Sequence, residues 1–287
     1  MGSILLTVIG LSQIAFRALS SGNSGVKRMI PFLHIVCYKW GKGYSAEEVN
    51  ILHAMVQRNL TIPHAFHCIT DDSAGLCQGI HVHDLPRNLP GNGPKIFTFS
   101  EGFLGLGPQD HVVSLDVDLV IVGNLDFLAE QPQEDFIITR HPNRRGDYVL
   151  HGAVYRLRVG SHCHIWDRFI ADPYGNAHRF PGVQGNRFSE QLWLEDQIAP
   201  QDWRFFPEGK IILFRTDCRA KEPARHINRV IGYLGLNIPS AGWGKARLPG
   251  HGEAIVSFAG QTKPHDVLST PHNRLRHAPF VAEYWHL

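Results

Sequence analysis

The sequence predicts an α/β domain built on a mostly parallel central sheet, and two features support this fold class. Apolar segments of strand length at 32–38, 65–70 and 111–115 each run into polar or glycine residues, with helical patterns elsewhere along the chain. The 287 residues, 43% of them hydrophobic and 19% charged, have the composition of a globular protein with a sizeable core. In such folds ligands bind beyond the carboxyl ends of the parallel strands, so the residues that follow each strand are the first candidates for a site.

The first strand, turn and helix follow one another closely. Residues 32–38 are apolar enough for a strand buried on both faces, and Gly41-Lys42-Gly43 supplies a turn after it. Ser45-Ala46-Glu47-Glu48 has the pattern of a capping box, in which serine and glutamate satisfy free backbone N–H groups at a helix start. Apolar residues then recur at helical spacing up to Leu60, which predicts a capped helix.

Later elements follow the same signals. We expect Ser161 and Ser189 to cap two further helices, the second ending before Pro200. Residues 172–187 are rich in proline, glycine and asparagine, which is typical of a long irregular loop. A packed helix beginning near Pro279 is favoured over a segment resting on a membrane surface, because no charged polar face accompanies it. One continuous domain over 29–287 is therefore expected.

Charge and cysteine content exclude some classes of protein. With 28 basic and 26 acidic residues, the net charge of +2 argues against a dedicated nucleic-acid binder. Five scattered cysteines without a C-x-x-C pair favour reduced thiols and a cytoplasmic location, with contact to the inner face of the membrane as an open alternative. The apolar run at 4–16 is shorter than the roughly 20 residues of a membrane-spanning helix. We expect residues 1–28 to be either a flexible extension or the result of a start assigned too early, with Met29 as the true beginning.

Two aspartates carry the prediction of chemistry. In HVVSLDVDLVIVGNLD, residues 111–126, an apolar strand runs directly into Asp116-Val117-Asp118. Side chains of an extended chain alternate, so both carboxylates can point the same way while Val117 points into the core. Paired hard oxygen ligands suit Mg²⁺ or Mn²⁺, whose remaining positions are usually filled by water and substrate phosphate. Two aspartates at a strand end often only solvate a loop, but here apolar segments flank them on both sides.

This pattern, with four further segments, resembles the GT-A glycosyltransferases, nearest to glycosyltransferase family 8 (the glycogenin and lipopolysaccharide galactosyltransferase group). The resemblance extends in patches from about Pro31 to Asp266, and SLDVDLVIVGNLD matches the family's strand, D-x-D and N-h-D pattern. It implies a single GT-A domain, Rossmann-like, that moves a hexose from a nucleotide sugar, UDP-linked by expectation, to a carbohydrate or glycolipid acceptor. It also implies retention of the anomeric configuration, although no nucleophile for a double displacement is evident.

The resemblance also implies roles for individual residues. The segments that hold the nucleotide resemble VCYKWGKGYS and CITDD, and the basic residue near the metal is supplied by GPKIF. The acid–glutamine pair beside the sugar resembles Glu195-Asp196-Gln197. The late signature that clamps the diphosphate resembles FAGQTKP. The implied donor-binding residues are Tyr38, Lys39, Trp40, Tyr44, Asp71, Lys95, Asp116, Val117, Gly260 and Lys263. The implied catalytic residues are Asp196 and Gln197, and the implied metal ligands are Asp116, Asp118 and Ser257.

Two departures from the family pattern keep alternatives open. Ser257 stands where the family has a metal-binding histidine, so His251 or His265 could serve instead. The sugar-binding N-S-G segment is replaced by Leu150-His151-Gly152-Ala153, which indicates an altered donor or acceptor preference. A non-catalytic descendant that binds a sugar nucleotide or a partner is therefore an alternative. A phosphatase of the haloacid dehalogenase type, which also uses D-x-D after a strand, is a weaker one.

The predicted chemistry is transition-state charge stabilisation. Breaking an anomeric C–O bond leaves a nucleoside diphosphate that carries additional negative charge. A cation held by Asp116 and Asp118 stabilises that charge as a Lewis acid, and Lys263 and Lys95 add further positive charge. The sugar becomes oxocarbenium-like, and Asp196 or Gln197 could stabilise it.

Overall fold

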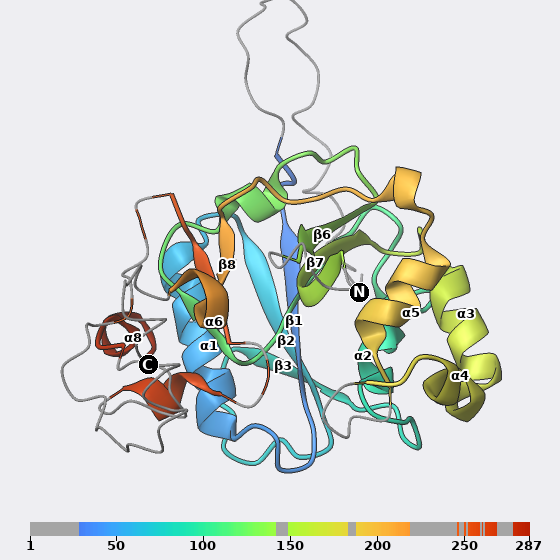
Figure 1. Cartoon of the computed structure of the whole chain (residues 1–287), viewed down its shortest axis with the longest axis horizontal. Helices are drawn as coiled ribbons and strands as arrows, with labels where there is room; N and C mark the ends of the chain where they lie inside the picture. Colours follow the sequence, from blue (N-terminus) through green and yellow to red (C-terminus); the bar gives the residue numbers. More distant parts are fainter. Residues whose placement is uncertain are drawn as a thin grey trace, which may run out of the picture.

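The computed structural model (Figure 1) describes residues 29–141, 149–182, 188–218, 246, 250, 252–258, 260, 262–268 and 278–287. Its central sheet has six strands in the order β3-β2-β1-β4-β7-β6. Strands β1 to β4 run parallel, β7 runs antiparallel to β4, and β6 runs antiparallel to β7. The predicted α/β class with a mostly parallel sheet is thus confirmed. The strands are β1 (Leu33–Lys39), β2 (His64–Thr70), β3 (Ile80–Asp84), β4 (His111–Leu115), β6 (Phe136–Arg140) and β7 (Leu150–Arg158).

A second, smaller sheet begins where the two aspartates end. It has the order β5-β9-β8, with β5 at Leu119–Ile121, β8 at Ile211–Leu213 and β9 at Ile255–Ser257. Residues 116–118 are the only link between β4 of the large sheet and β5 of the small one. The Asp-Val-Asp segment therefore lies at the junction of the two sheets.

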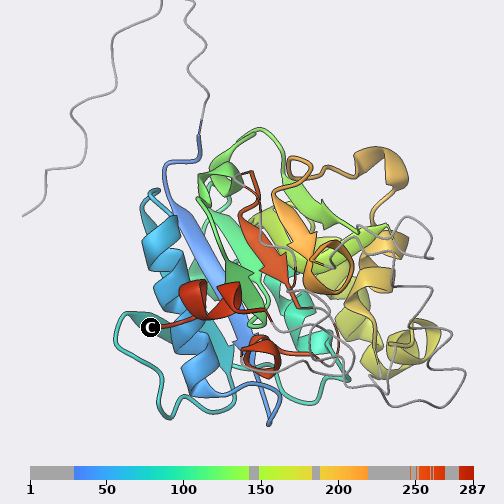
Figure 2. The same cartoon turned by 60° about the vertical axis from the view of Figure 1, so that its left-hand side comes forward.

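Helix α1 (Ala46–Asn59) covers one face of the large sheet. Val49, Leu52 and Met55 are buried on it and join the alternate β1 residues Leu33 and Ile35 in one core. The alternation of strand side chains and the helical spacing of apolar residues thus meet at this interface. Helix α8 (Phe280–Tyr284) lies beside α1, where the Arg58 guanidinium donates to the carbonyls of Tyr284 and His286 at 3.0 and 2.8 Å (Figure 2).

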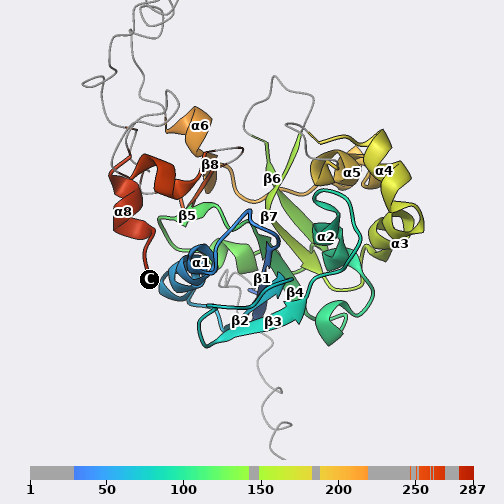
Figure 3. The same cartoon turned by 90° about the horizontal axis from the view of Figure 1, so that it is seen from below.

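The remaining α-helices near the strands β6 and β7 gather at the other end of the molecule (Figure 3). They are α2 (Gly93–Ile96), α3 (Cys163–Ala171), α4 (Pro173–Arg179) and α5 (Glu190–Gln197), whereas α6 (Phe214–Asp217) follows β8. Short 3₁₀ helices lie at η1 (Phe97–Phe99), η2 (Phe103–Gly105), η3 (Asp126–Ala129), η4 (Pro200–Asp202) and η5 (Pro264–Val267). A core of aromatic side chains, including Phe99, Phe169 and Trp193, joins α3 and α5 to β6 and β7.

Most expected elements are confirmed, and two are not. The elements that lie where the sequence places them are strands β1, β2 and β4, the capping box at Ser45, the cap at Ser189 and the packed helix after Pro279. The Ser161 cap is wrong: its hydroxyl donates to the Arg158 carbonyl at 2.7 Å instead, and α3 begins after His162 without a side-chain cap. The irregular loop at 172–187 is wrong in part, since α4 forms with Asp172 as its cap.

The described part of the chain contains no helix that is both long and apolar enough to cross a membrane. Residues 1–28 lie outside the described part, so the expectation for them stays a prediction. The first described residues are joined to the domain, because Met29 bridges to Glu130 and Ile30 is buried.

The α1 cap supports a first stability prediction. Ser45 accepts a hydrogen bond from the Glu48 N–H at 3.2 Å, and Glu48 accepts one from the Ser45 N–H at 2.8 Å. Ser45→Ala should lower the free energy of unfolding by about 1 kcal/mol, because one helix N–H loses its partner. Chemical denaturation measures the difference. Ser73→Ala, in an exposed turn, is the control, and equal losses in the two variants would contradict the assignment.

Candidate functional site

The two aspartates lie at the carboxyl end of β4, as predicted. Val117 is buried in the core between them, and the Asp116 N–H donates to the Ala153 carbonyl of β7 at 2.9 Å. Asp118 is 6% exposed, whereas the Asp116 side chain is 31% exposed. Burial and the charge of Asp116 raise the pKa of Asp118 to about 6, against the lowering effect of Lys263. The two carboxylates therefore lie on the same side of the chain and close enough to repel each other.

Lys95 forms an ion pair with Asp116. Its ammonium lies 2.8 Å from Asp116 Oδ1, 2.7 Å from Glu190 Oε2 and 3.1 Å from the Gly152 carbonyl. Burial by itself lowers the pKa of this lysine, but the carboxylates of Asp116 and Glu190 outweigh it and raise the pKa above its ordinary value. An ammonium has three N–H donors, and here each has an acceptor. In this arrangement the Lys95 ammonium therefore binds protein groups in place of the donor that the sequence predicts it to bind.

Lys263 forms an ion pair with Asp118. Its ammonium lies 2.8 Å from Asp118 Oδ2 and 3.0 Å from the Tyr44 hydroxyl, and 4.3 Å from the centre of the Tyr44 ring. Burial and the negative charges of Asp118 and Asp116 raise the pKa of Tyr44, so this hydroxyl stays protonated. Residues from opposite ends of the chain, Tyr44 before α1 and Lys263 before η5, thus meet at the aspartates as the resemblance implies.

Glu190 is a site residue that the sequence reasoning missed. It is the first residue of α5, directly after the Ser189 cap, and it is 3% exposed. Its Oε2 pairs with Lys95, and within the described residues its buried Oε1 has no hydrogen-bond partner. A Cβ at Gly152 would lie 3.2 Å from the Glu190 carboxyl carbon, so a glycine there lets the carboxylate approach β7 closely. Burial raises the pKa of Glu190 to about 7.

Asp196 and Gln197, the predicted catalytic pair, lie at the other end of α5. The Gln197 amide donates to Asp196 at 2.6 Å and accepts from Arg168 at 3.0 Å. Both line a separate pocket of about 380 Å³ that also contains Arg179 and Phe180. Six residues of helix place Asp196 about 9 Å from Glu190 along the axis. The structure thus brings Glu190, and not Asp196 or Gln197, into contact with the Lys95–Asp116 pair.

The signal that could have located Glu190 is its position. The sequence contains two acid–glutamine pairs in this region, Glu190-Gln191 and Asp196-Gln197. The first follows a serine cap, where a helix N-terminus begins and a carboxylate is favoured by the helix dipole. In the structure Glu190, at the N-terminus of α5, pairs with Lys95, whereas Glu195 in its last turn accepts from the Val149 and Leu150 N–H groups at the start of β7.

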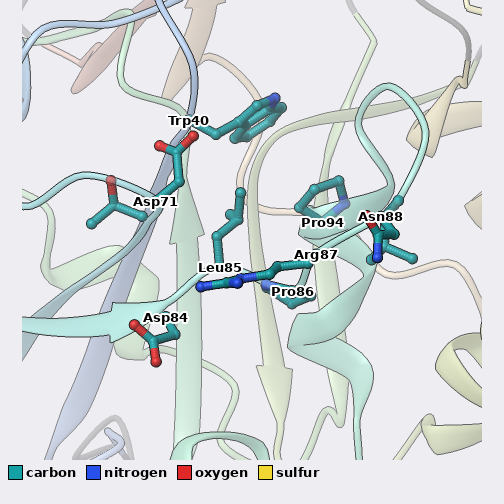
Figure 4. Close-up of a pocket in the computed structure, with 10 residues that line it drawn as sticks. Trp40, Asp71, Asp84, Leu85, Pro86, Arg87, Asn88 and Pro94 are labelled. Atoms are coloured by element: carbon teal, nitrogen blue, oxygen red, sulfur yellow. The ribbon is translucent and has the colours of Figure 1, made fainter.

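A pocket of about 420 Å³ opens beside this cluster, at the ends of β1, β2 and β3 (Figure 4). Trp40 and Asp71 lie on one side of it, and Arg87 extends below Leu85 in the direction of Asp84. Pro94, which also lines the pocket, is the chain neighbour of Lys95 and so connects the pocket with the cluster. The lining residues are Trp40, Thr70, Asp71, Asp84, Leu85, Pro86, Arg87, Asn88, Leu89 and Pro94.

The residues predicted to hold the nucleotide divide into two groups. Trp40 and Asp71 line the pocket, and the Asp71 carboxylate also accepts from the Gly41 N–H at 3.0 Å, where Gly41 has a φ of 58°. Tyr38 and Lys39 instead point into the protein. The Tyr38 hydroxyl bonds to Thr98 at 2.8 Å, and the Lys39 ammonium donates to the Asp72 carbonyl at 2.7 Å. These two side chains stabilise the loop rather than line the cavity.

The residues around the two aspartates include several possible ligands for the predicted Mn²⁺ or Mg²⁺. Ser257 is buried on β9 and pairs with Leu119, next to Asp118, so the late segment reaches the aspartates as expected. His265 turns away, with its ring nitrogens 3.6 Å from Glu48 and 3.4 Å from Asp266, and His251 lies outside the described residues. Within the described residues no three His, Cys, Asp or Glu side chains converge as metal ligands.

Two carboxylates nevertheless fit a hard cation that is shared with a substrate. Mg²⁺ is commonly held by one or two carboxylates together with water and phosphate oxygens. The Lys263 ammonium already places a positive charge 2.8 Å from Asp118 Oδ2, where such an ion would bind. The Asp116 side chain is 31% exposed, so part of this carboxylate can also meet an incoming ion. The residues present therefore suit a cation that arrives with its diphosphate rather than one bound by protein ligands alone.

Comparison with known proteins agrees with the fold. No protein-family model matches the sequence, and no curated protein matches it either. The glycosyltransferase GlyE of Streptococcus pneumoniae TIGR4 has a TM-score of 0.51 over 88% of this chain and 60% of its own, with 14% identity. Its apo form gives 0.50 with the same coverage and identity. The galactosyltransferase LgtC, solved with donor and acceptor sugar analogs, gives 0.45 over 87% of this chain and 94% of its own, at 13% identity.

The likeness to GlyE shows that the chain has a GT-A glycosyltransferase fold. This chain spans about 60% of the length of GlyE. The expected fold is therefore confirmed.

Glu190 gives a pH-dependent stability prediction. Its folded-state pKa of about 7 lies above that of an ordinary carboxyl, so its favourable contribution is present at low pH and is lost as the pH rises through 7. The free energy of unfolding of the wild type should fall relative to that of Glu190→Gln between about pH 5 and about pH 8, by up to roughly 3 kcal/mol. Urea denaturation at several pH values measures this. A difference that stays constant with pH would show that the carboxyl is not held in a desolvated site.

Proposed function

We propose that this chain, which has the GT-A fold, is a glycosyltransferase that moves a hexose from a nucleotide sugar to a carbohydrate or glycolipid acceptor. UDP is the first candidate for the nucleotide, and Mn²⁺ or Mg²⁺ for the cation. The observation that carries the proposal is one cluster of five ionisable side chains, two lysines and three carboxyl groups, beside a nucleotide-sized pocket. The cluster lies at the carboxyl end of β4 and consists of Lys95, Asp116, Asp118, Glu190 and Lys263.

The pocket suits the nucleoside part of the donor. Its volume of about 420 Å³ falls within the range of small-ligand sites. Trp40 offers an apolar ring surface to a base, and the Asp71 carboxylate can accept hydrogen bonds from ribose hydroxyls. Asp84 and Arg87, on the other side, can accept from and donate to polar base atoms. A nucleoside in this pocket would direct its phosphates past Pro94 toward the aspartates.

The cluster suits the diphosphate. As the anomeric bond breaks, the leaving nucleoside diphosphate gains negative charge, which preorganised cations stabilise most strongly in a site with little water. Lys263 donates to Asp118 and Tyr44 within the described residues, and its ammonium can donate to a phosphate oxygen when a diphosphate is bound. A divalent cation held by Asp116 and Asp118, when bound, would supply Lewis-acid stabilisation to the same leaving group.

Glu190 suits the sugar. Lys95 fixes one oxygen of this carboxylate and the α5 cap fixes its backbone, so its orientation is set before a ligand binds. The buried Oε1, with no partner in the described residues, can accept a hydrogen bond from a sugar hydroxyl. A negative charge at this place also favours the positive charge that develops on the sugar ring. Glu190 therefore takes the role that the sequence assigned to Asp196 and Gln197.

The central test uses Asp118→Asn with a panel of nucleotide sugars. The wild type should be stabilised against thermal unfolding by one UDP-linked sugar, more strongly with Mn²⁺ than without it. Asp118→Asn should lose the Mn²⁺-dependent part of this shift and lower the rate of sugar transfer by about a hundredfold or more, because the leaving diphosphate loses a stabilising cation.

Other outcomes would redirect the proposal. Full transfer activity in Asp118→Asn would overturn it. UDP binding that EDTA leaves unchanged, without donor hydrolysis, would support the non-catalytic alternative. Phosphate release from an aryl phosphate, in the absence of any nucleotide-sugar effect, would support the phosphatase alternative.

A paired comparison tests the assignment of Glu190. Glu190→Gln should lower kcat by about a hundredfold, while Asp196→Asn should change it by less than about threefold, because only Glu190 contacts the Lys95–Asp116 pair. Steady-state kinetics with the donor found in the panel measures both. A larger loss in Asp196→Asn than in Glu190→Gln would return the catalytic role to the end of α5.

A further inference from the structure

The two lysines of the cluster differ in their freedom to move. The Lys95 side chain is 8% exposed, and its three N–H donors meet Asp116, Glu190 and the Gly152 carbonyl. The Lys263 side chain is 21% exposed and meets two acceptors, Asp118 and Tyr44, within the described residues. Lys95 is therefore a fixed part of the site, whereas Lys263 can leave its position at a lower cost.

We propose that Lys263 competes with the divalent cation for Asp118, and that it moves to the donor diphosphate when cation and nucleotide bind together. This inference rests on the proposed function and concerns the order in which the same site is filled. Lys263 is in this view a positioning residue that occupies the cation site until the donor arrives.

Geometry and charge support the competition. Asp118 Oδ2 accepts the Lys263 ammonium at 2.8 Å, and the same carboxylate must face an incoming cation. An ammonium and a divalent ion on one carboxylate would lie within a few ångströms of each other and repel strongly in a buried site. Cation binding therefore requires Lys263 to leave. Asp118 is 6% exposed, so its carboxylate is also unfavourable without a positive partner. When no divalent cation is bound, Lys263 is that partner.

The diphosphate supplies the place to which Lys263 moves. A lysine has a flexible stem and a compact charge, which lets it exchange one anion for another over a short distance. When the nucleotide is bound, its phosphates offer oxygen acceptors to the displaced ammonium. Cation and nucleotide then assist each other, and this coupling must be the same whichever of them binds first.

The test measures cation binding without catalysis. Lys263→Met removes the competing charge, so Mn²⁺ alone should bind the variant roughly tenfold more tightly than the wild type, as expected for the loss of one competing charged hydrogen bond. UDP should bind the same variant roughly tenfold more weakly, because a phosphate contact is lost. Electron paramagnetic resonance of free Mn²⁺ and calorimetry with UDP give the two affinities. Lys263→Gln should change both in the same directions, and thermal unfolding checks that each variant is folded.

The matched control is Lys210→Met, which removes the same charge from a lysine that lies 6.0 Å from the Phe127 ring and outside the cluster. It should leave both affinities unchanged. Equal or weaker Mn²⁺ binding by folded Lys263→Met, relative to the wild type, overturns the competition while leaving the proposed transferase standing. Absence of Mn²⁺ binding in wild type and variant, with and without UDP, overturns the competition together with the proposed cation site.

Discussion

The site depends on the pairing of buried carboxylates with lysine ammonium groups at the junction of the two sheets. A carboxylate removed from water is stable only when a cation or several donors compensate it. Asp118 with Lys263, and Asp116 and Glu190 with Lys95, satisfy this condition at 2.7–2.8 Å. With three carboxylates and two lysines, the cluster retains an excess of negative charge when all are ionised. That excess gives the site its attraction for a further cation.

Local structure places each of these groups. Val117 anchors the Asp-Val-Asp segment in the core and leaves both aspartates on the same side. The Ser45 capping box fixes the start of α1, directly after Tyr44, and the Ser189 cap fixes the start of α5 at Glu190. Gly152 admits the Glu190 carboxylate where any larger residue would meet it at 3.2 Å. Ordinary capping and packing thus create the preorganised charge that the proposed chemistry requires.

Under the proposed function, the serine at position 257 would change how the cation is held. With a serine rather than a histidine there, the two carboxylates would contribute most of the protein's ligand strength, and the diphosphate of the proposed donor the rest. Lys263 is the partner of Asp118 in the structure, and in the proposed exchange it would become a partner of the phosphates. The segment Leu150-His151-Gly152-Ala153, which stands where the resembled family has N-S-G, lies at this site, since the Gly152 carbonyl accepts from Lys95 and a Cβ there would meet Glu190.

The sequence by itself determined the fold class, the strands that lead to the site and the two aspartates, because these depend on short-range alternation, capping and apolar periodicity. Only the tertiary structure decided which acidic residue of α5 reaches the site, since both Glu190 and Asp196 precede a glutamine and the contact with Lys95 that distinguishes them is made across the fold. It also decided that Tyr38 and Lys39 point inward, and that Lys263 crosses the fold to Asp118. Such pairings join residues as far as 145 positions apart, and local patterns carry no information about them.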